Sequence, residues 1–180
     1  LLIFSYGFTS AGELIPPLAN EEWLIEEARR FQVSPILVLT PFTETGGFNN
    51  QLVKEVSEDR TMQEQLIANL LSVVEEKGYD GVDVDFEYIL PEDRVGYADF
   101  VGRLRTAMNE TGRSVSVALA PKISADQPGL LYEGMDYRLL GENADRVFLM
   151  TYEWGYTYGP PMAVAPINKV RQVLDYAVTE

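Results

Sequence analysis

The chain has 180 residues, 46% hydrophobic and 23% charged, which is typical of a single globular domain. Its net charge of −14 opposes binding to nucleic acid or to an anionic membrane surface. No cysteine or histidine is present, which excludes disulfides, Ser–His–Asp and Cys–His catalysis, and the usual zinc sites. Proton transfer would therefore fall to Asp, Glu, Tyr or Lys. No apolar run approaches the ~20 residues of a membrane span, so membrane insertion is not expected.

Short apolar runs alternate along the chain with amphipathic stretches. A Gly- and Asn-rich loop is expected over 43–50. Helices are expected over 21–31, 61–77, 91–111 and 167–177, where apolar residues recur at helical spacing. Buried strands are expected over 1–6, 35–40, 81–86, 114–120 and 146–152.

This alternation predicts an α/β fold in which a parallel sheet has helices outside it. A doubly wound sheet and a TIM (β/α)8 barrel both fit, but no glycine-rich phosphate loop follows the first strand. Five strands fall short of the eight strands and ~250 residues of a barrel. We therefore expect residues 1–180 to form a single, partial barrel domain. The chain opens within a strand, at Leu1-Leu2-Ile3-Phe4, which is typical of a piece of something longer.

The most informative segment is the expected third strand with its acidic residues. Side chains alternate across a strand, so Asp83, Asp85 and Glu87 face one side and the intervening apolar residues face the helices. In a barrel the acids point inward, with Glu87 nearest the mouth at the carboxyl end. Neighbouring carboxylates ~7 Å apart cannot all ionise cheaply in a low dielectric. At least one should keep its proton, as a general acid requires.

Three other interpretations of this segment are less favoured. A solvated edge strand is disfavoured by the flanking apolar residues. An EF-hand calcium loop would need glycine at its sixth position, where Tyr88 stands. A metal-binding DxD motif lacks a second acidic cluster or a phosphate loop.

Two segments resemble family 18 glycoside hydrolases. DGVDVDFE, at 80–87, matches every fixed position of the family's DGxDxDxE signature, and MTYE, at 150–153, resembles its MxY[DE] segment. GYDGVDVDFEY at 78–88, ALAPK at 118–122 and MTYEWGYTYGPPMAVAPI at 150–167 resemble the bacterial spore cortex-lytic N-acetylglucosaminidases within that family. The resemblance extends over nearly the whole chain.

The resemblance implies a retaining, substrate-assisted glycosidase without cofactor or metal. Glu87 would protonate the glycosidic oxygen, and the substrate's own 2-acetamido oxygen would attack the anomeric carbon. Asp85 would hold the acetamido N–H, Asp83 would share a proton with Asp85, and Tyr152 would donate its hydroxyl to the acetamido oxygen.

The resemblance also implies a substrate and a location. The substrate would be an N-acetylglucosamine-containing glycan with β-1,4 bonds, namely peptidoglycan of the spore cortex or cell wall, and the location extracellular or in the spore envelope. LysM-type modules outside this chain are possible partners. A chitinase or chitooligosaccharide hydrolase is the rival within the class, and a non-catalytic carbohydrate-binding member or an inactive fragment is the rival outside it.

Several residues at or after strand ends are candidate substrate contacts, because aromatic rings stack on the apolar faces of sugars. The chain departs from the family pattern in two places. It has no last strand with the tryptophan that forms a floor under the sugar, and Leu39-Thr40-Pro41-Phe42 stands where the family usually has a Ser-Gly-Gly segment. We therefore expect residues 1–180 alone to have little activity. The candidate contacts are Tyr6, Phe42, Tyr88, Met150, Glu153 and Trp154, with Tyr156 and Tyr158 as further aromatic candidates.

Overall fold

A single six-stranded sheet organises the molecule. In a computed structural model, which describes residues 1–42, 47–155 and 158–180, the strand order is β2-β1-β3-β4-β5-β6. All neighbours run parallel except the short β1–β2 pair. The strands are β1 (Leu2–Phe8), β2 (Leu14–Ile15), β3 (Ile36–Leu39), β4 (Gly81–Val84), β5 (Ser114–Leu119) and β6 (Arg146–Leu149).

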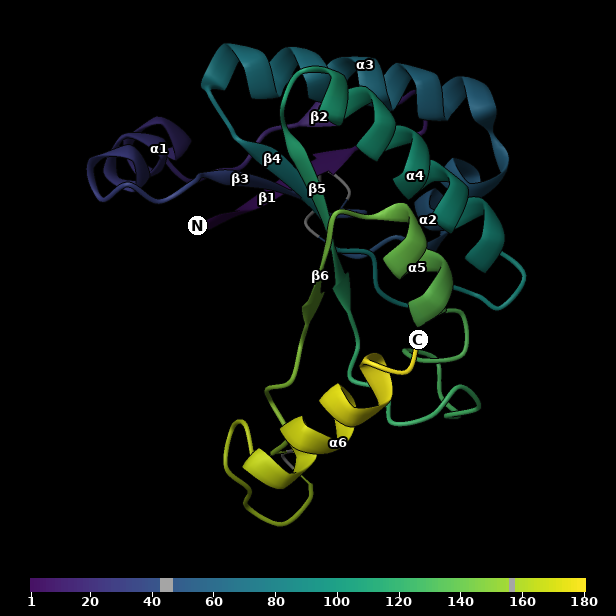
Figure 1. Ribbon diagram of the computed structural model, residues 1–180. Helices are drawn as coiled ribbons and strands as arrows, with labels where there is room; N and C mark the ends of the chain where they lie inside the picture. The colour runs from purple at the N-terminus through teal and green to yellow at the C-terminus, as the bar shows by residue number, and fades with distance from the viewer. Residues whose placement is uncertain (43–46, 156–157) are drawn as a thin grey trace.

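Helices cover the outer face of this sheet, and α6 lies apart from them, beyond the end of β6 (Figure 1). The apolar residues of β4 pack outward, and the ring of Phe86 stacks on Tyr97 and Phe100 of α4 at 5.4 and 6.1 Å between centroids. The mostly parallel sheet with helices on its outer face confirms the expected α/β, partial-barrel fold. The helices are α1 (Glu21–Arg30), α2 (Asn50–Glu58), α3 (Arg60–Lys77), α4 (Arg94–Glu110), α5 (Tyr137–Asn143) and α6 (Ile167–Ala177).

Three elements were not predicted, and several boundaries differ: β1 runs to Phe8, β4 ends at Val84 and β6 ends at Leu149. The strand β2 has only two residues, and α5 only seven, so neither carries a periodic signal. The helix α2 begins after Asn49, whose side chain accepts a hydrogen bond from the Gln51 N–H and caps the helix within the stretch expected to be a loop. α4 begins at Arg94 rather than at Pro91. Residues 43–46 of the expected loop lie outside the described residues.

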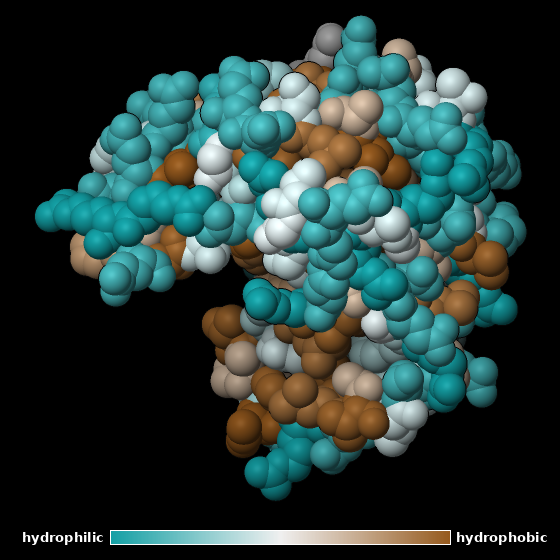
Figure 2. Space-filling view, turned by 45° about the horizontal axis from the view of Figure 1, so that its top comes forward, coloured by the Kyte–Doolittle hydropathy of each residue, from teal (hydrophilic) through white to brown (hydrophobic). Residues whose placement is uncertain are grey.

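One edge of the sheet is open at β6. Val147 and Phe148 are 42% and 40% exposed, although strands of a closed parallel barrel are buried. Figure 2 shows hydrophobic side chains gathered at the lower end of the molecule, where Figure 1 places α6 and the segment before it. Within the described ranges, no helix is long and apolar enough to cross a membrane.

Candidate active site

A cleft of 620 Å³ lies at the carboxyl end of the central strands. Parallel strands bring their carboxyl ends to one edge, where the sites of (β/α) barrels are found. The cleft combines the end of β4 with the ends of β5 and β6 and with part of the loop after β5. Its lining residues are Phe4, Asp85, Glu87, Tyr88, Ala120, Pro121, Leu131, Tyr132, Met150, Tyr152, Glu153 and Trp154.

The three acids of the β4 end lie at successive depths below this cleft. Asp83 is 1% exposed, pairs in register with Ser116 of β5, and accepts a short hydrogen bond from the Ser116 hydroxyl. Asp85 is 9% exposed, and its N–H donates to the Leu39 carbonyl at 2.9 Å, which continues the sheet past β4. Glu87 is half-buried and lines the cleft. The order of depths is the one that strand alternation predicts.

Burial raises the pKa of each of these acids, and repulsion from a nearby carboxylate adds to it at Asp85 and Glu87. Burial, followed by the charges of Glu87 and Asp83, raises the pKa of Asp85 to about 7. Burial also raises the pKa of Asp83, which the hydrogen bond from Ser116 partly opposes. Burial and the charge of Glu153 raise the pKa of Glu87. Protonated carboxyls are therefore available in the cleft nearer to neutral pH than in water.

One oxygen of Asp85 is left without a partner. Oδ1 is buried and has no hydrogen-bond partner among the described residues. The indole Nε1 of Trp154 is likewise buried and unpaired within the described part of the chain. Buried polar atoms are normally paired, so an acceptor and a donor that remain free beside a cleft are ready to bind a polar ligand.

The β6 end supplies the opposite side of the cleft. The Met150 N–H donates to the Leu119 carbonyl at 3.0 Å, and the chain then leaves the sheet. Tyr152 is 42% exposed. Burial, followed by the charge of Asp85, raises its pKa, so its hydroxyl stays protonated and able to donate. Lys169 of α6 stacks over the Trp154 ring at 5.8 Å from its centroid.

Both strand ends turn sharply through a residue in the left-handed region. Tyr88, directly after Glu87, has φ 56°, and Glu153, directly after Tyr152, has φ 60°. Non-glycine residues rarely adopt this conformation, and such strain is concentrated at functional sites. No feature of the sequence predicts it at these two positions.

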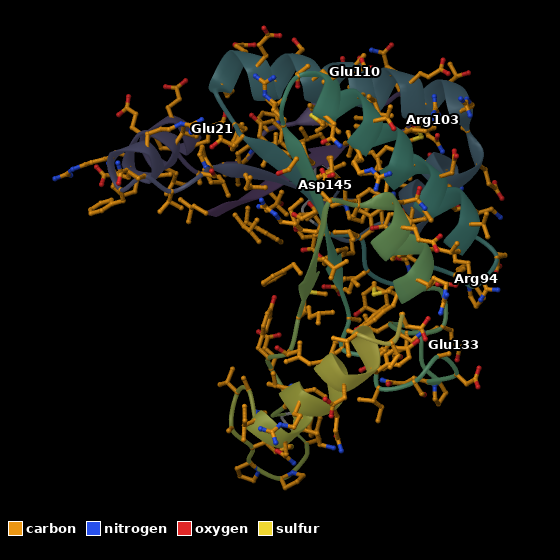
Figure 3. The ribbon with its side chains drawn as sticks, viewed as in Figure 1. Glu21, Arg94, Arg103, Glu110, Glu133 and Asp145 are labelled. Atoms are coloured by element: carbon orange, nitrogen blue, oxygen red, sulfur yellow. The ribbon has the colours of Figure 1, made fainter. Side chains whose placement is uncertain are left out.

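Two expected substrate contacts lie elsewhere. Tyr6 was expected to contact substrate, but it does not line the cleft. Its ring is buried, and its hydroxyl donates to the two oxygens of the Glu21 carboxylate on α1, at 2.9 and 2.7 Å. Figure 3 shows Glu21 at the opposite side of the molecule from α6. Phe42 does not line the cleft but packs edge-on against Phe4, which does, at 6.1 Å.

Tyr156 lies outside the described residues, and Tyr158 is largely exposed. The expected contacts that do line the cleft are Tyr88, Met150, Glu153 and Trp154. The sequence analysis singled out no individual residue from three other segments of the cleft lining, although ALAPK at 118–122 belongs to one of them. These residues are Phe4, Ala120, Pro121, Leu131 and Tyr132.

Among the described residues, no group of three acidic side chains converges closely enough to hold a metal ion. This finding disfavours the interpretation of Asp83 and Asp85 as a metal-binding DxD motif. That the activity does not depend on a metal stays a prediction.

Comparison with known proteins gives consistent matches. The cortical fragment-lytic enzyme of Bacillus subtilis is 39% identical over 98% of this chain and 40% of its own length. The crystal structure of the Bacillus cereus spore cortex-lytic enzyme SleL superposes with a TM-score of 0.91, at 35% identity over 99% of this chain and 40% of that one. A chitinase from Chromobacterium violaceum, 24% identical over 99% of this chain and 56% of that one, shares the fold with a TM-score of 0.89.

The chain thus spans about 40% of the length of the curated relatives that it matches. Residues 44–179 match the sequence profile described as "Glycosyl hydrolases family 18", and this stretch contains both signature segments. The chain belongs to family 18 of the glycosyl hydrolases.

Proposed function

We propose that residues 1–180 carry the acid-bearing half of the catalytic domain of a retaining glycosidase that cleaves β-1,4 bonds next to N-acetylglucosamine. The observation that supports this most strongly is the unpartnered Asp85 Oδ1, buried beside Glu87 at the base of the cleft. It is an acceptor without a donor, and an acetamido N–H is the donor that such a substrate would bring.

The proposed reaction begins with proton transfer from Glu87 to the glycosidic oxygen. Glu87 is the acid nearest the cleft mouth, and its raised pKa keeps a larger fraction protonated at neutral pH. As the leaving group departs, the acetamido oxygen of the substrate attacks the anomeric carbon. Water then opens the resulting oxazolinium with Glu87 as base, so the configuration is inverted twice and retained overall.

Asp85 and Tyr152 hold the acetamido group from two sides in this proposal. Asp85 accepts its N–H and stabilises the positive charge that develops on the ring, while Asp83 shares a proton with Asp85 from below. Tyr152 donates its hydroxyl to the acetamido oxygen across the cleft. Fixing the nucleophile in this way lowers the barrier mainly through orientation.

Peptidoglycan is the proposed substrate, since the relatives that match most of the chain at 35–39% identity are named for lysis of the spore cortex. Action in the spore envelope or outside the cell, with LysM-type modules outside residues 1–180, belongs to the same proposal. Chitin is the second candidate, favoured by the chitinase that shares the fold.

The test is an assay of the full-length protein and its Glu87→Gln variant on spore peptidoglycan and on chitin oligosaccharides. We expect kcat to fall by ~10²–10⁴-fold in the variant while substrate binding persists, because the amide keeps the shape but has no acidic proton. Binding without turnover in the unaltered protein would instead identify a non-catalytic carbohydrate-binding member. Loss of activity in EDTA, restored by a divalent ion, would contradict the metal-independent mechanism.

A further inference from the structure

One wall of the cleft comes from a loop that begins within ALAPK at 118–122 and lies outside the two family signature segments. The connection between β5 and α5, residues 120–136, is called here the wall loop. Ala120 and Pro121 at its start, and Leu131 and Tyr132 near its end, all line the cleft. The anchoring of the wall loop therefore affects the shape of the cleft that Glu87 also lines.

The two ends of the wall loop are tied together by Lys122 and Tyr137. Lys122 is 3% exposed, and its Nζ donates to the Met135 carbonyl at 2.9 Å. The Tyr137 hydroxyl donates to the Ala120 carbonyl at 2.6 Å and accepts from the Lys122 N–H at 2.9 Å. These hydrogen bonds therefore hold the backbone on both sides of Pro121, and they hold it again at Met135, three residues after Tyr132.

A buried lysine is an uncommon choice for such an anchor. Burial lowers the pKa of Lys122, and the nearby charge of Asp136 only partly opposes this. An apolar side chain of similar size is often as good as a buried charge for stability. What an apolar side chain cannot do is hold the Met135 carbonyl in place by a hydrogen bond.

The wall loop is also seated directly on the segment that follows Glu87. A Cβ at Gly134 would lie 1.9 Å from the carbonyl oxygen of Ile89, so the two backbones touch where no side chain fits. The Tyr132 ring in turn lies against Gly129, whose φ is +127° and whose added Cβ would be 3.1 Å from the ring. Figure 3 shows Glu133, the neighbour of Tyr132, beside the end of α6. The close approach of Gly134 to Ile89 therefore fixes the loop that carries Tyr132 next to the segment that follows Glu87.

We propose that Tyr132 contacts the glycan in the cleft and that Lys122 is the positioning residue that holds the wall loop, and with it Tyr132, against the end of β5. The ring offers an apolar face to a pyranose, and its distance from the acid decides which sugar unit it meets. The inference rests on the proposed function, since it takes the occupant of the cleft to be a glycan.

The test compares Tyr132→Ala, Lys122→Met and the double variant in the full-length protein, with chitin oligosaccharides as the substrate. Each single change should raise KM by ~10-fold, the size of one lost aromatic contact, and leave kcat within ~3-fold. Because both act through the same contact, the double variant should raise KM little more than either alone. Independent effects that multiply to ~100-fold would overturn the link between the two residues.

The matched control is Val101→Ala, a buried truncation on α4 outside the cleft, which should lower Tm without changing KM. Tyr132→Ala trims a half-buried side chain, so it tests the contact even if Lys122→Met does not fold. Binding of the same oligosaccharide to Tyr132→Ala in a Glu87→Gln background gives a second readout without turnover, and Kd should rise ~10-fold there too. If the unaltered protein cleaves and KM and Kd are unchanged in the variants, this inference alone fails. If the unaltered protein neither binds nor cleaves, the proposed function fails with it.

Discussion

The two strand ends that face each other across the cleft are built differently. At the β4 end, the strand has hydrogen-bonded neighbours on both sides, and Asp83 and Asp85 are almost fully buried. At the β6 end, the strand is paired on one side only, and Tyr152 is 42% exposed. The acids are therefore held by the packed part of the sheet, whereas the Tyr152 ring lies against the half-exposed Phe148 ring of the edge strand β6, at 6.3 Å between centroids.

This difference separates two contributions to catalysis. Burial at the β4 end produces the raised pKa values, which are a property of the packed sheet. The position of Tyr152 depends instead on the turn at Glu153 and on the contact of its ring with Phe148. Substitutions at the β4 end should therefore change the chemistry more than those at the β6 end.

The largest difference is expected for Asp85→Asn at the β4 end. The amide keeps the volume but cannot stabilise the positive charge on the sugar, so kcat should fall by ~10²–10³-fold. Single-turnover kinetics on an oligosaccharide measures this directly. A fall of less than ~3-fold would place the acetamido contact elsewhere.

A smaller effect is expected for Tyr152→Phe at the β6 end. The change removes one hydroxyl donor to the acetamido oxygen and leaves the ring, so kcat should fall by about tenfold. Steady-state kinetics beside Tyr158→Phe, an exposed tyrosine that does not line the cleft, provides the comparison. Equal losses in the two variants would remove Tyr152 from the proposed mechanism.

The buried β4 end should also make stability depend on pH. The pKa of Asp85 in the folded protein, about 7, is above the ~3.9 of an unfolded aspartate. Its contribution to stability is therefore full below pH ~4 and is lost as pH rises through about 7. Relative to Asp85→Asn, the wild type should lose on the order of 2–4 kcal/mol in the free energy of unfolding over this range.

Urea denaturation at several pH values measures the loss. Asp99→Asn, at an exposed aspartate on α4, is the control and should follow the wild type. If Asp85→Asn follows the wild type as well, Asp85 is already ionised in the folded protein at low pH.

The smallest effect tests the charge of Glu153 at the β6 end on Glu87 at the β4 end. Glu153 raises the pKa of Glu87, so Glu153→Gln should lower it and move the alkaline limb of kcat/KM to lower pH, by up to ~1 unit. The pH profile of Glu26→Gln, at an exposed glutamate on α1, should match the wild type. An unmoved alkaline limb in Glu153→Gln would show that the two carboxylates do not interact.

The difference between the two ends also explains which features of the site the sequence could predict. Period-2 alternation fixes the faces of Asp83, Asp85 and Glu87, and unbroken apolar runs mark the parallel strands, so these features were predictable. Tyr6 also ends an apolar run, but its hydroxyl bonds to Glu21, 15 residues away, and no local pattern reports such a contact. The wall loop was missed because it is ordered by single contacts at Lys122 and Gly134 rather than by periodicity.

The central claim is that the substrate's own acetamido oxygen is the nucleophile, held between Asp85 and Tyr152. The most direct test is to lower the nucleophilicity of that oxygen. The measurement is kcat/KM of the full-length protein on aryl 2-acylamido glycosides whose acyl group carries zero, one, two or three fluorines. Each fluorine makes the amide oxygen a poorer nucleophile, so kcat/KM should fall steeply and steadily along the series, while the first product keeps the β configuration. A flat series, or an inverted product, would contradict the account, because attack by an enzyme carboxylate or by water does not need that oxygen.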